Sequence, residues 1–366
     1  MQTKERSLGH WYRISLMPVP KFAAGLYESA HEFKPSVQRK VGVLILVAAI
    51  LAMLFSNLFY DQYSHLLESS SVIPSWTWAK FVDKGIMSIF FFAAGMEIRH
   101  EFFHGHLTKP ELRKLPLYCA IGGVFGPLIL MGMFGTIFTL FGASNSSDIF
   151  RGSPIPIATD IVFALAFLSF FSNKVPRSLR AFVLAFAVID DLIGLCMLFV
   201  LQGTISPTAI AVVLGFLIPS NIGTYQIRSH FLANLLIVNS FIVLPIFALA
   251  NAGISFKGFS PKDLASEPLF WSIVISQFIG KIAGIFGVAM FAFKSPKLLV
   301  PAGCNKQHLL LAASVAAIGF TLSLYLAKAA FSEDEATLLI AKSAVVIATL
   351  ISVVFATYTA RKLPSK

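Results

Sequence analysis

The sequence predicts an all-α, polytopic membrane protein of about ten transmembrane helices, with inverted-topology repeats and two interrupted helices. Three observations predict this fold class. The 366 residues are 56% hydrophobic and only 13% charged, roughly half the charged fraction of soluble domains. Long uncharged windows recur along the whole chain. The basic residues gather in alternate connections between those windows.

The composition also restricts the partners of the chain. It has 29 Lys and Arg residues against 18 Asp and Glu, a formal net charge of +11. In a soluble protein this excess would indicate nucleic acid, whereas in a membrane protein it marks one side of the membrane. We therefore expect the lipid bilayer, and no nucleic acid, as a partner. The scattered cysteines Cys119, Cys196 and Cys304 favour neither a disulfide framework nor a paired-cysteine metal site.

The apolar windows give the predicted spans in order. A helix that crosses about 30 Å of hydrocarbon needs roughly 20 apolar residues. Ten windows are of about this length, and the sixth is the shortest. They are residues 41–60, 80–98, 115–141, 154–172, 181–201, 204–219, 231–251, 269–293, 307–331 and 336–360.

The basic residues orient these spans. When the connections are assigned alternately to two sides, 21 Lys and Arg residues fall on one side and 3 on the other. The richer side is expected to be the cytoplasm, so both termini should lie there. The chain then divides into a cytoplasmic N-terminal tail, 1–40, and a single membrane transporter domain, 41–366. The tail has no apolar core, so we expect no cleavable signal peptide.

Charged residues inside the spans are the functional candidates, because an ionised group near a helix centre costs about 2.5–3.5 kcal/mol. Four of them lie deep in the windows: Asp160, Asp190, Asp191 and Lys281. Others lie nearer the span ends. Lys80, Glu97 and Lys328 can reach the interface along their aliphatic stems, and Asp83 and Lys84 can pair locally.

Asp190 and Asp191 are adjacent in the fifth window. Neighbouring helical residues point about 100° apart, so one carboxylate can face a wet cavity while the other faces a partner helix. A carboxylate that alternately holds a proton or a hard cation is the simplest device for ion exchange. Oxygen ligands suit such cations. We therefore expect Na⁺ binding and proton exchange at this aspartate pair.

Two windows contain sequences that interrupt a helix. In the fourth, two prolines precede Thr159 and Asp160, and the ninth contains Gly319 and Phe320 in the run Ala316-Ala-Ile-Gly-Phe-Thr. Such breaks are tolerated in a membrane only where the freed backbone groups face protein or water. These spans run in opposite directions, which predicts an inverted-repeat transporter with a midplane ion site and repeats at 115–201 and 269–360.

The ends of half-helices carry partial charges that need compensation. We expect Asp160 to offset the exposed N-termini, with Thr159 beside it at the break. Lys281 is expected to offset the exposed C-termini.

The motifs around these residues resemble the NhaA-type Na⁺/H⁺ antiporter family. They follow the family's order from about residue 41 to 360, and the Ala-Thr-Asp and Asp-Asp elements are the most specific. The motifs are Gly95-Met-Glu-Ile-Arg-His-Glu-Phe-Phe, Pro156-Ile-Ala-Thr-Asp-Ile-Val-Phe-Ala-Leu, Ile189-Asp-Asp-Leu, Leu249-Ala-Asn-Ala-Gly, Ile279-Gly-Lys and Ile318-Gly-Phe-Thr-Leu-Ser.

The resemblance implies a multi-pass antiporter of the bacterial inner membrane, not an enzyme, which expels Na⁺ or Li⁺ in exchange for external H⁺. Sodium and pH homeostasis would be its role, and no cofactor is expected besides the transported ions. The resemblance implies Asp191 as the ion-binding carboxylate, with Asp190 beside it, and Lys281 as the partner of the first aspartate. Glu97 corresponds to an acid at the cytoplasmic funnel. Two exchangeable carboxylates suggest about two H⁺ per Na⁺, which would make exchange electrogenic.

Two of the departures from the family pattern concern its spans and its assembly. The family normally has twelve spans, and two are missing here between Asp191 and Pro207. The outer segment 61–79 is short for the family's dimer-forming hairpin, so a homodimer stays open.

Three other functions are alternatives to Na⁺/H⁺ antiport. One is a Na⁺-coupled organic anion transporter of similar fold, and another is a shortened relative that does not transport. The third is an intramembrane aspartyl protease, whose carboxyl groups must approach within about 3 Å. Adjacent aspartates on one helix do not provide that geometry.

Overall fold

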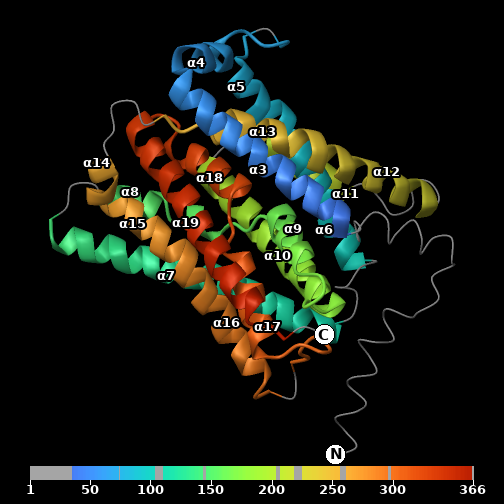
Figure 1. Ribbon diagram of the computed structural model, residues 1–366. Coiled ribbons are helices and arrows are strands. Elements are labelled where there is room, and N and C mark those ends of the chain that lie inside the picture. The colour runs from blue at the N-terminus through green and yellow to red at the C-terminus, as the bar shows by residue number, and fades with distance from the viewer. Residues whose placement is uncertain are drawn as a thin grey trace, which may run out of the picture.

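The computed structural model describes residues 35–73, 75–103, 110–142, 146–202, 207–217, 225–255, 261–295 and 298–364. Within these ranges the chain is helical, apart from its connections and one isolated β-bridge between Ser70 and Thr77. The helices form one bundle, with α4 and α5 at the end opposite the C-terminus (Figure 1). The all-α fold class predicted from the sequence is thus confirmed.

The first half of the bundle contains the first five predicted spans. α3 begins earlier than expected, so the last six residues assigned to the tail are helical; proline is well suited to a first helical turn. A short hairpin, α4 with α5, then leads through the π-helical turn η1 into α6. The bounds are α3 Pro35–Leu58, α4 Tyr60–Glu68, α5 Trp78–Lys80, η1 Phe81–Ile86, α6 Met87–Phe103, α7 Pro110–Leu140, α8 Ser146–Arg151, η3 Ile155–Ile157, α9 Ile161–Phe170 and α10 Arg177–Gln202.

The second half contains the remaining five predicted spans. Two of them are interrupted by π-helical turns, η4 and η5, which are rare and often lie at functional sites. The bounds are α11 Pro207–Leu217, α12 Tyr225–Val238, η4 Asn239–Val243, α13 Leu244–Asn251, α14 Pro261–Ser266, α15 Pro268–Ile275, η5 Ser276–Gly280, α16 Lys281–Ala292, α17 Lys306–Ala316, α18 Thr321–Phe331 and α19 Glu335–Arg361.

The lengths of these helices suit a membrane, with one exception. Five of the described helices are long and apolar enough to cross it, and the number rises to seven if each bent helix pair is one span. The sixth predicted span is different, because the 11 residues of α11 extend only about 17 Å at 1.5 Å per residue. That is too short to cross the hydrocarbon core alone.

The two predicted helix breaks are present. The segment Ser146–Ile157 meets α9 at an angle of 50°, and α17 meets α18 at 42°. The first break follows from the two prolines before it, since proline removes a backbone donor and cannot continue a regular helix. The second lies at Ala317–Phe320, where Gly319 breaks the ladder.

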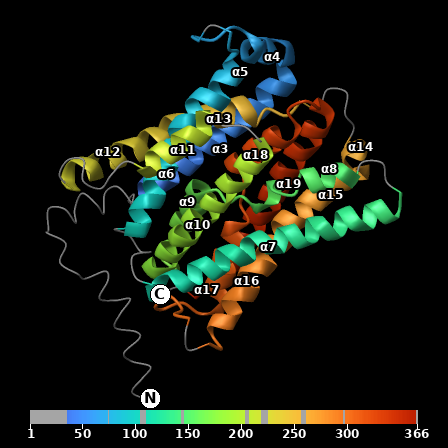
Figure 2. The ribbon, with the colours of Figure 1, turned by 180° about the vertical axis from the view of Figure 1, so that it is seen from behind.

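A glycine seam holds α7 against α16 and so fixes the position of Lys281. A Cβ on Gly126 would collide with the backbone carbonyl of Gly280, and one on Gly122 would collide with that of Gly284. Small residues four apart on both helices let the two backbones touch, as in membrane helix pairs. Figure 2 shows α7 lying across this face of the bundle.

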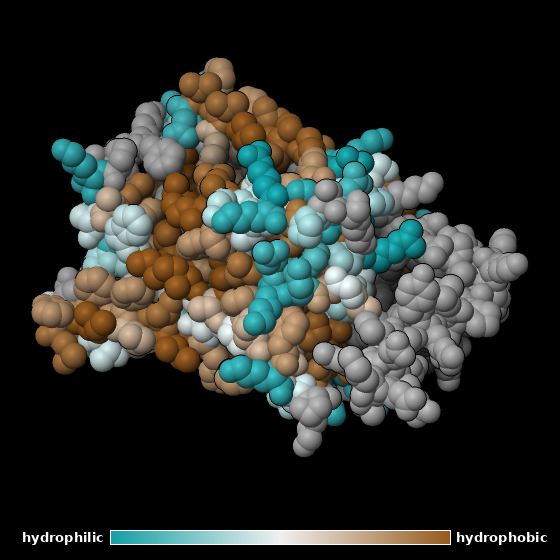
Figure 3. All heavy atoms as spheres, turned by 60° about the horizontal axis from the view of Figure 1, so that its bottom comes forward, coloured by the Kyte–Doolittle hydropathy of each residue, from teal (hydrophilic) through white to brown (hydrophobic). Residues whose placement is uncertain are grey.

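The outer surface separates by polarity. Large apolar side chains are exposed along the flanks of several helices, among them Phe125 and Ile129 of α7 and Leu350 and Val354 of α19. In a view with the C-terminal end turned forward, hydrophilic residues gather near the middle, and hydrophobic residues cover much of the left side and the top (Figure 3). This distribution is what a multi-pass membrane protein requires.

Candidate ion-exchange site

The two helix breaks cross each other inside the bundle. The backbone N–H of Asp160 donates to the carbonyl of Ile318 at 3.0 Å. The Thr159 hydroxyl donates to the carbonyl of Ala316, also at 3.0 Å. Phe320 of the second break packs edge-on against Phe163 of α9, with ring centroids 5.5 Å apart. The freed carbonyls of Ala316 and Ile318 are therefore satisfied by the opposite break.

Asp160 caps both half-helices that begin at the crossing. Its Oδ1 accepts from the N–H of Phe163 in α9 at 3.1 Å. Its Oδ2 accepts from the N–H of Thr321 at 3.1 Å and from the Thr321 hydroxyl at 2.6 Å. One buried carboxylate thus meets two helix N-termini, where partial positive charge favours an anion.

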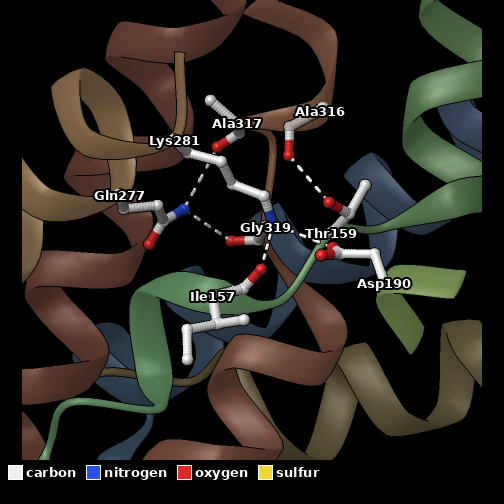
Figure 4. Close-up of polar contacts among 8 residues, drawn as sticks. All are labelled: Ile157, Thr159, Asp190, Gln277, Lys281, Ala316, Ala317 and Gly319. Atoms are coloured by element: carbon white, nitrogen blue, oxygen red, sulfur yellow. Dashed lines mark hydrogen bonds and ion pairs between the residues drawn. The ribbon is translucent and has the colours of Figure 1, made fainter. Parts of the chain in front are cut away.

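Two side chains one helical turn apart donate hydrogen bonds to the carbonyls at the C-terminal ends of the half-helices that meet at the crossing. The Lys281 ammonium group donates to the carbonyl of Ile157, the last residue of η3. The Gln277 amide donates to the carbonyl of Gly319 at 3.0 Å and to that of Ala317 at 3.4 Å. Figure 4 shows both side chains reaching into the crossing from the same helix. Gly319 also accepts from the Thr349 hydroxyl of α19 at 2.7 Å.

The adjacent aspartates of α10 point to different surroundings. Asp190 Oδ2 lies 3.0 Å from the Lys281 Nζ, and both side chains are fully buried. Asp191 instead lines a cavity, and its Oδ1 is buried without a hydrogen-bond partner among the described residues. Of the two predicted ion-exchange carboxylates, the structure therefore places Asp191 in the cavity and Asp190 on the lysine.

The cavity beside Asp191 is small and polar on one side. Its volume is about 90 Å³, which leaves room for a few waters or a partly hydrated ion. Polar residues of α3, α6, the breaks, α10 and η4 line it: Gln38, Glu97, Thr159, Asp160, Asp191, Asn239, Ser240 and Thr321. Lys281 is not in this lining, so the charged groups that face the cavity are carboxyl groups.

The donor set of the cavity suits an alkali cation better than a transition metal. Among the described residues, no group of three or more His, Cys, Asp or Glu side chains is placed to hold a metal ion. The cavity offers carboxylate, amide and hydroxyl oxygens, which are hard ligands.

A second charged cluster lies outside this cavity. It joins η1 to the C-terminal ends of α13 and α18. Lys328 of α18 forms an ion pair with Asp83 of η1. Asn251 joins them, because its Nδ2 lies 3.0 Å from Asp83 and its Oδ1 accepts from Lys328 at 3.2 Å. The expected local pairing of Asp83 with Lys84 is therefore wrong: neighbouring residues of a helix do not face each other.

Comparison with known proteins places the chain in a family. The family model described as Na⁺/H⁺ antiporter 1 matches residues 35–200 and 193–359. The chain belongs to this family. The two matches overlap at 193–200, directly after Asp191, which is where the resemblance to the family predicts the loss of two spans.

Curated relatives agree with this membership. The Na⁺/H⁺ antiporter NhaA of Aliivibrio fischeri (strain MJ11) is 31% identical to this chain over 79% of it and 86% of the relative. The protein of the same name from Actinobacillus pleuropneumoniae serotype 7 is 31% identical over 81% and 86%. The Na⁺/H⁺ antiporter NhaA 1 of Clostridium beijerinckii is 30% identical over 86% and 90%. These relatives are named as transporters.

Sequence reasoning missed the neutral polar residues of this family member's site. Gln277, Thr321, Gln38 and Asn239 all contact the crossing or line the cavity. A search for charged residues inside apolar windows passes over them. Gln277 had a signal available, because it precedes Lys281 by four residues and so shares its helix face.

Proposed function

We propose that this chain exchanges Na⁺ or Li⁺ for H⁺ across the bacterial inner membrane, with both termini in the cytoplasm. The observation that carries the proposal is the unpartnered carboxylate oxygen of Asp191, buried in a small cavity beside the crossing of two broken helices. Membership of the Na⁺/H⁺ antiporter 1 family and relatives named as such antiporters support it. The proposal requires no cofactor besides the transported ions.

The exchange step follows from the cost of burying an unpaired charge. An isolated carboxylate away from water is so unfavourable that it takes up either a cation or a proton. When Asp191 binds Na⁺ it releases its proton, and when it binds a proton it releases Na⁺. One site occupied in turn by the two ions couples their movements.

The surroundings of Asp191 favour a small cation over an organic anion. Pockets for small organic molecules usually enclose about 300–1,000 Å³, whereas this cavity encloses about 90 Å³. Its charged lining is acidic, with Asp191, Asp160 and Glu97. An anionic substrate would meet repulsion there. Glu97, which lies toward the α6 C-terminus, would attract cations from the cytoplasmic side in this proposal.

We further propose that about two protons enter for each Na⁺ expelled, one at each of the adjacent aspartates. At Asp190 the Lys281 ammonium group replaces the proton in the structure described. Such exchange moves one net charge, so a membrane potential would drive it by about 2.3 kcal/mol per 100 mV. Collapsing the potential in vesicles while clamping pH on both sides should then slow Na⁺ efflux.

The deciding experiment is Asp191→Asn in the full chain, reconstituted in liposomes with a pH-sensitive dye inside. Asparagine keeps the shape of the side chain but cannot exchange a proton. We expect Na⁺-triggered and Li⁺-triggered pH changes to disappear. The matched control is Asp148→Asn, which removes a carboxylate of α8 outside the cavity and should exchange like wild type. Undiminished exchange by Asp191→Asn would refute the mechanism, and a wild type without exchange would favour a non-transporting relative.

A further inference from the structure

Two neutral amide side chains lie in the wall of the Asp191 cavity, in addition to its carboxylates. Gln38 belongs to the first turn of α3 and Asn239 begins the π-helical turn η4. They are buried, with 9% and 6% of their surfaces exposed. Gln38 Oε1 and Asn239 Oδ1 have no hydrogen-bond partner among the described residues. Asp191 Oδ1, in the same cavity, is unpartnered too.

The fold brings these two residues together from distant parts of the chain. η4 packs between α12 and α13 and contacts both α3 and α6, the helix of Glu97. A π-helical turn inserts an extra residue into a helix, and such turns are concentrated at functional sites. Here the turn begins with Asn239 and Ser240, and both line the cavity.

Another buried asparagine has both ends of its amide satisfied, whereas Gln277 Oε1, outside the cavity, has no partner among the described residues; what sets Gln38 and Asn239 apart is therefore their place in the cavity wall. Asn251, 1% exposed, donates to Asp83 and to the carbonyl of Phe247, and accepts from Lys328. Burying an amide oxygen without such partners is unfavourable. The unfilled oxygens of Gln38 and Asn239 are therefore positioned for something that enters the cavity.

We propose that the side-chain oxygens of Gln38 and Asn239 complete the coordination of the alkali cation held by Asp191. Carboxylate and amide oxygens together are the ligands that hard cations take in proteins. A neutral oxygen attracts the cation without adding a second group that titrates near Asp191. It thus stabilises the Na⁺-bound state without adding a proton-binding group to the cavity. This inference rests on the proposed cation exchange.

The test removes each oxygen and measures cation affinity. The variants Asn239→Leu and Gln38→Leu are reconstituted as full chains, and exchange is measured over a range of Na⁺ and Li⁺ concentrations. We expect each variant to raise the KM for Na⁺ about tenfold, the effect of losing one contact to a charged group. The maximal rate should change little. Asn239→Gln, which keeps a neutral amide oxygen on this side chain, should raise the KM less than Asn239→Leu does.

A second readout needs no transport. A cation that binds only the folded protein raises its thermal stability in proportion to ln(1 + [Na⁺]/Kd). In detergent, stabilisation of Asn239→Leu by Na⁺ should require about tenfold higher concentration than that of wild type. The matched control is Ser343→Ala: its hydroxyl is also buried and unpartnered but does not line the cavity. It should behave as wild type in both assays.

The outcomes separate this inference from the proposed function. If wild type exchanges ions and both leucine variants keep its KM and its Na⁺ stabilisation, the inference is overturned and antiport stands. If wild type does not exchange but is stabilised by Na⁺ more strongly than Asn239→Leu, the cation site stands and antiport falls. If Na⁺ stabilises neither protein, the site is refuted. Should Asn239→Leu fail to fold, Asn239→Ala carries the same expectation without added bulk.

Discussion

In the part of the chain that the structure describes, two lysine–aspartate pairs join distant helices, and they differ mainly in how far their side chains are exposed at the protein surface. Lys281 and Asp190, at the crossing of the broken helices, are both fully buried. Lys328 and Asp83, near the opposite ends of the spans, keep 29% and 15% of their side chains exposed. Each lysine also bonds a second partner, the carbonyl of Ile157 and the amide of Asn251 respectively.

The comparison shows that breaking a Lys–Asp pair should destabilise the protein to a different extent when the pair is buried and when it is partly exposed. A buried pair gains a strong attraction, but it has also lost the hydration of both charges, so breaking it leaves one charge stranded. A half-exposed pair returns to water when it is broken. At the crossing, the single ammonium group of Lys281 both neutralises Asp190 and satisfies the carbonyl at a half-helix C-terminus.

The largest effect is therefore expected for Lys281→Ala. It leaves the Asp190 carboxylate buried and the carbonyl of Ile157 unsatisfied, and loss of one partner of a buried pair costs about 3–5 kcal/mol. Thermal unfolding of the detergent-solubilised protein measures this loss. The double variant Lys281→Ala/Asp190→Ala removes the stranded charge and should recover a substantial part of it. A single variant as stable as wild type would show that the pair is not needed.

The depth of a charge was also what made it predictable. Asp160, Asp190, Asp191 and Lys281 stand out because charge is rare in apolar windows, and the breaks because proline and glycine interrupt helices. The helix boundaries follow from the same windows, with the largest differences at the starts of α3, α8 and α12, and α11 is too short to cross the membrane alone. All these signals are local in the sequence.

The partners, in contrast, are set by packing between distant segments. Thr321 meets Asp160 across 161 positions of sequence, and Lys281 meets Asp190 across 91. No spacing rule reaches so far, and the Lys281–Asp190 pair was predicted only through the resemblance to the family. Neutral residues such as Gln277 and Asn239 give a weak signal, because an amide in a span costs less than a charge. Lys328 was expected to reach the interface, and its pairing with Asp83 depends on the docking of α18 against the η1 region.

An intermediate effect is expected at Gln277. Its neutral amide donates to the carbonyls of the second break, as the charged Lys281 donates to a carbonyl of the first. Gln277→Leu leaves the carbonyls of Ala317 and Gly319 without this donor, and a buried unsatisfied polar group costs about 1–3 kcal/mol. The unfolding temperature of Gln277→Leu should lie between those of the wild type and Lys281→Ala. Gln277→Glu sharpens the test: an ionised carboxylate of similar shape cannot donate and would face the same carbonyls, so it should be less stable than the leucine variant. If the wild type, Gln277→Leu and Gln277→Glu were equally stable, the Gln277 amide would not stabilise the second break.

The smallest effect is expected for Lys328→Ala at the half-exposed pair. Exposed ion pairs contribute about 0–1 kcal/mol, and two features keep this value low here. Asp83 retains the Asn251 amide as a donor when the lysine is removed. Lys342 of α19 repels Lys328, so the removal of the Lys328 ammonium group also relieves this repulsion. Stability should therefore drop by less than about 1 kcal/mol at low salt, and the difference from wild type should shrink as salt is raised, since salt screens exposed charges. A loss comparable to that of Lys281→Ala, unchanged by salt, would show that this pair is shielded from water in the bilayer and that depth does not separate the two.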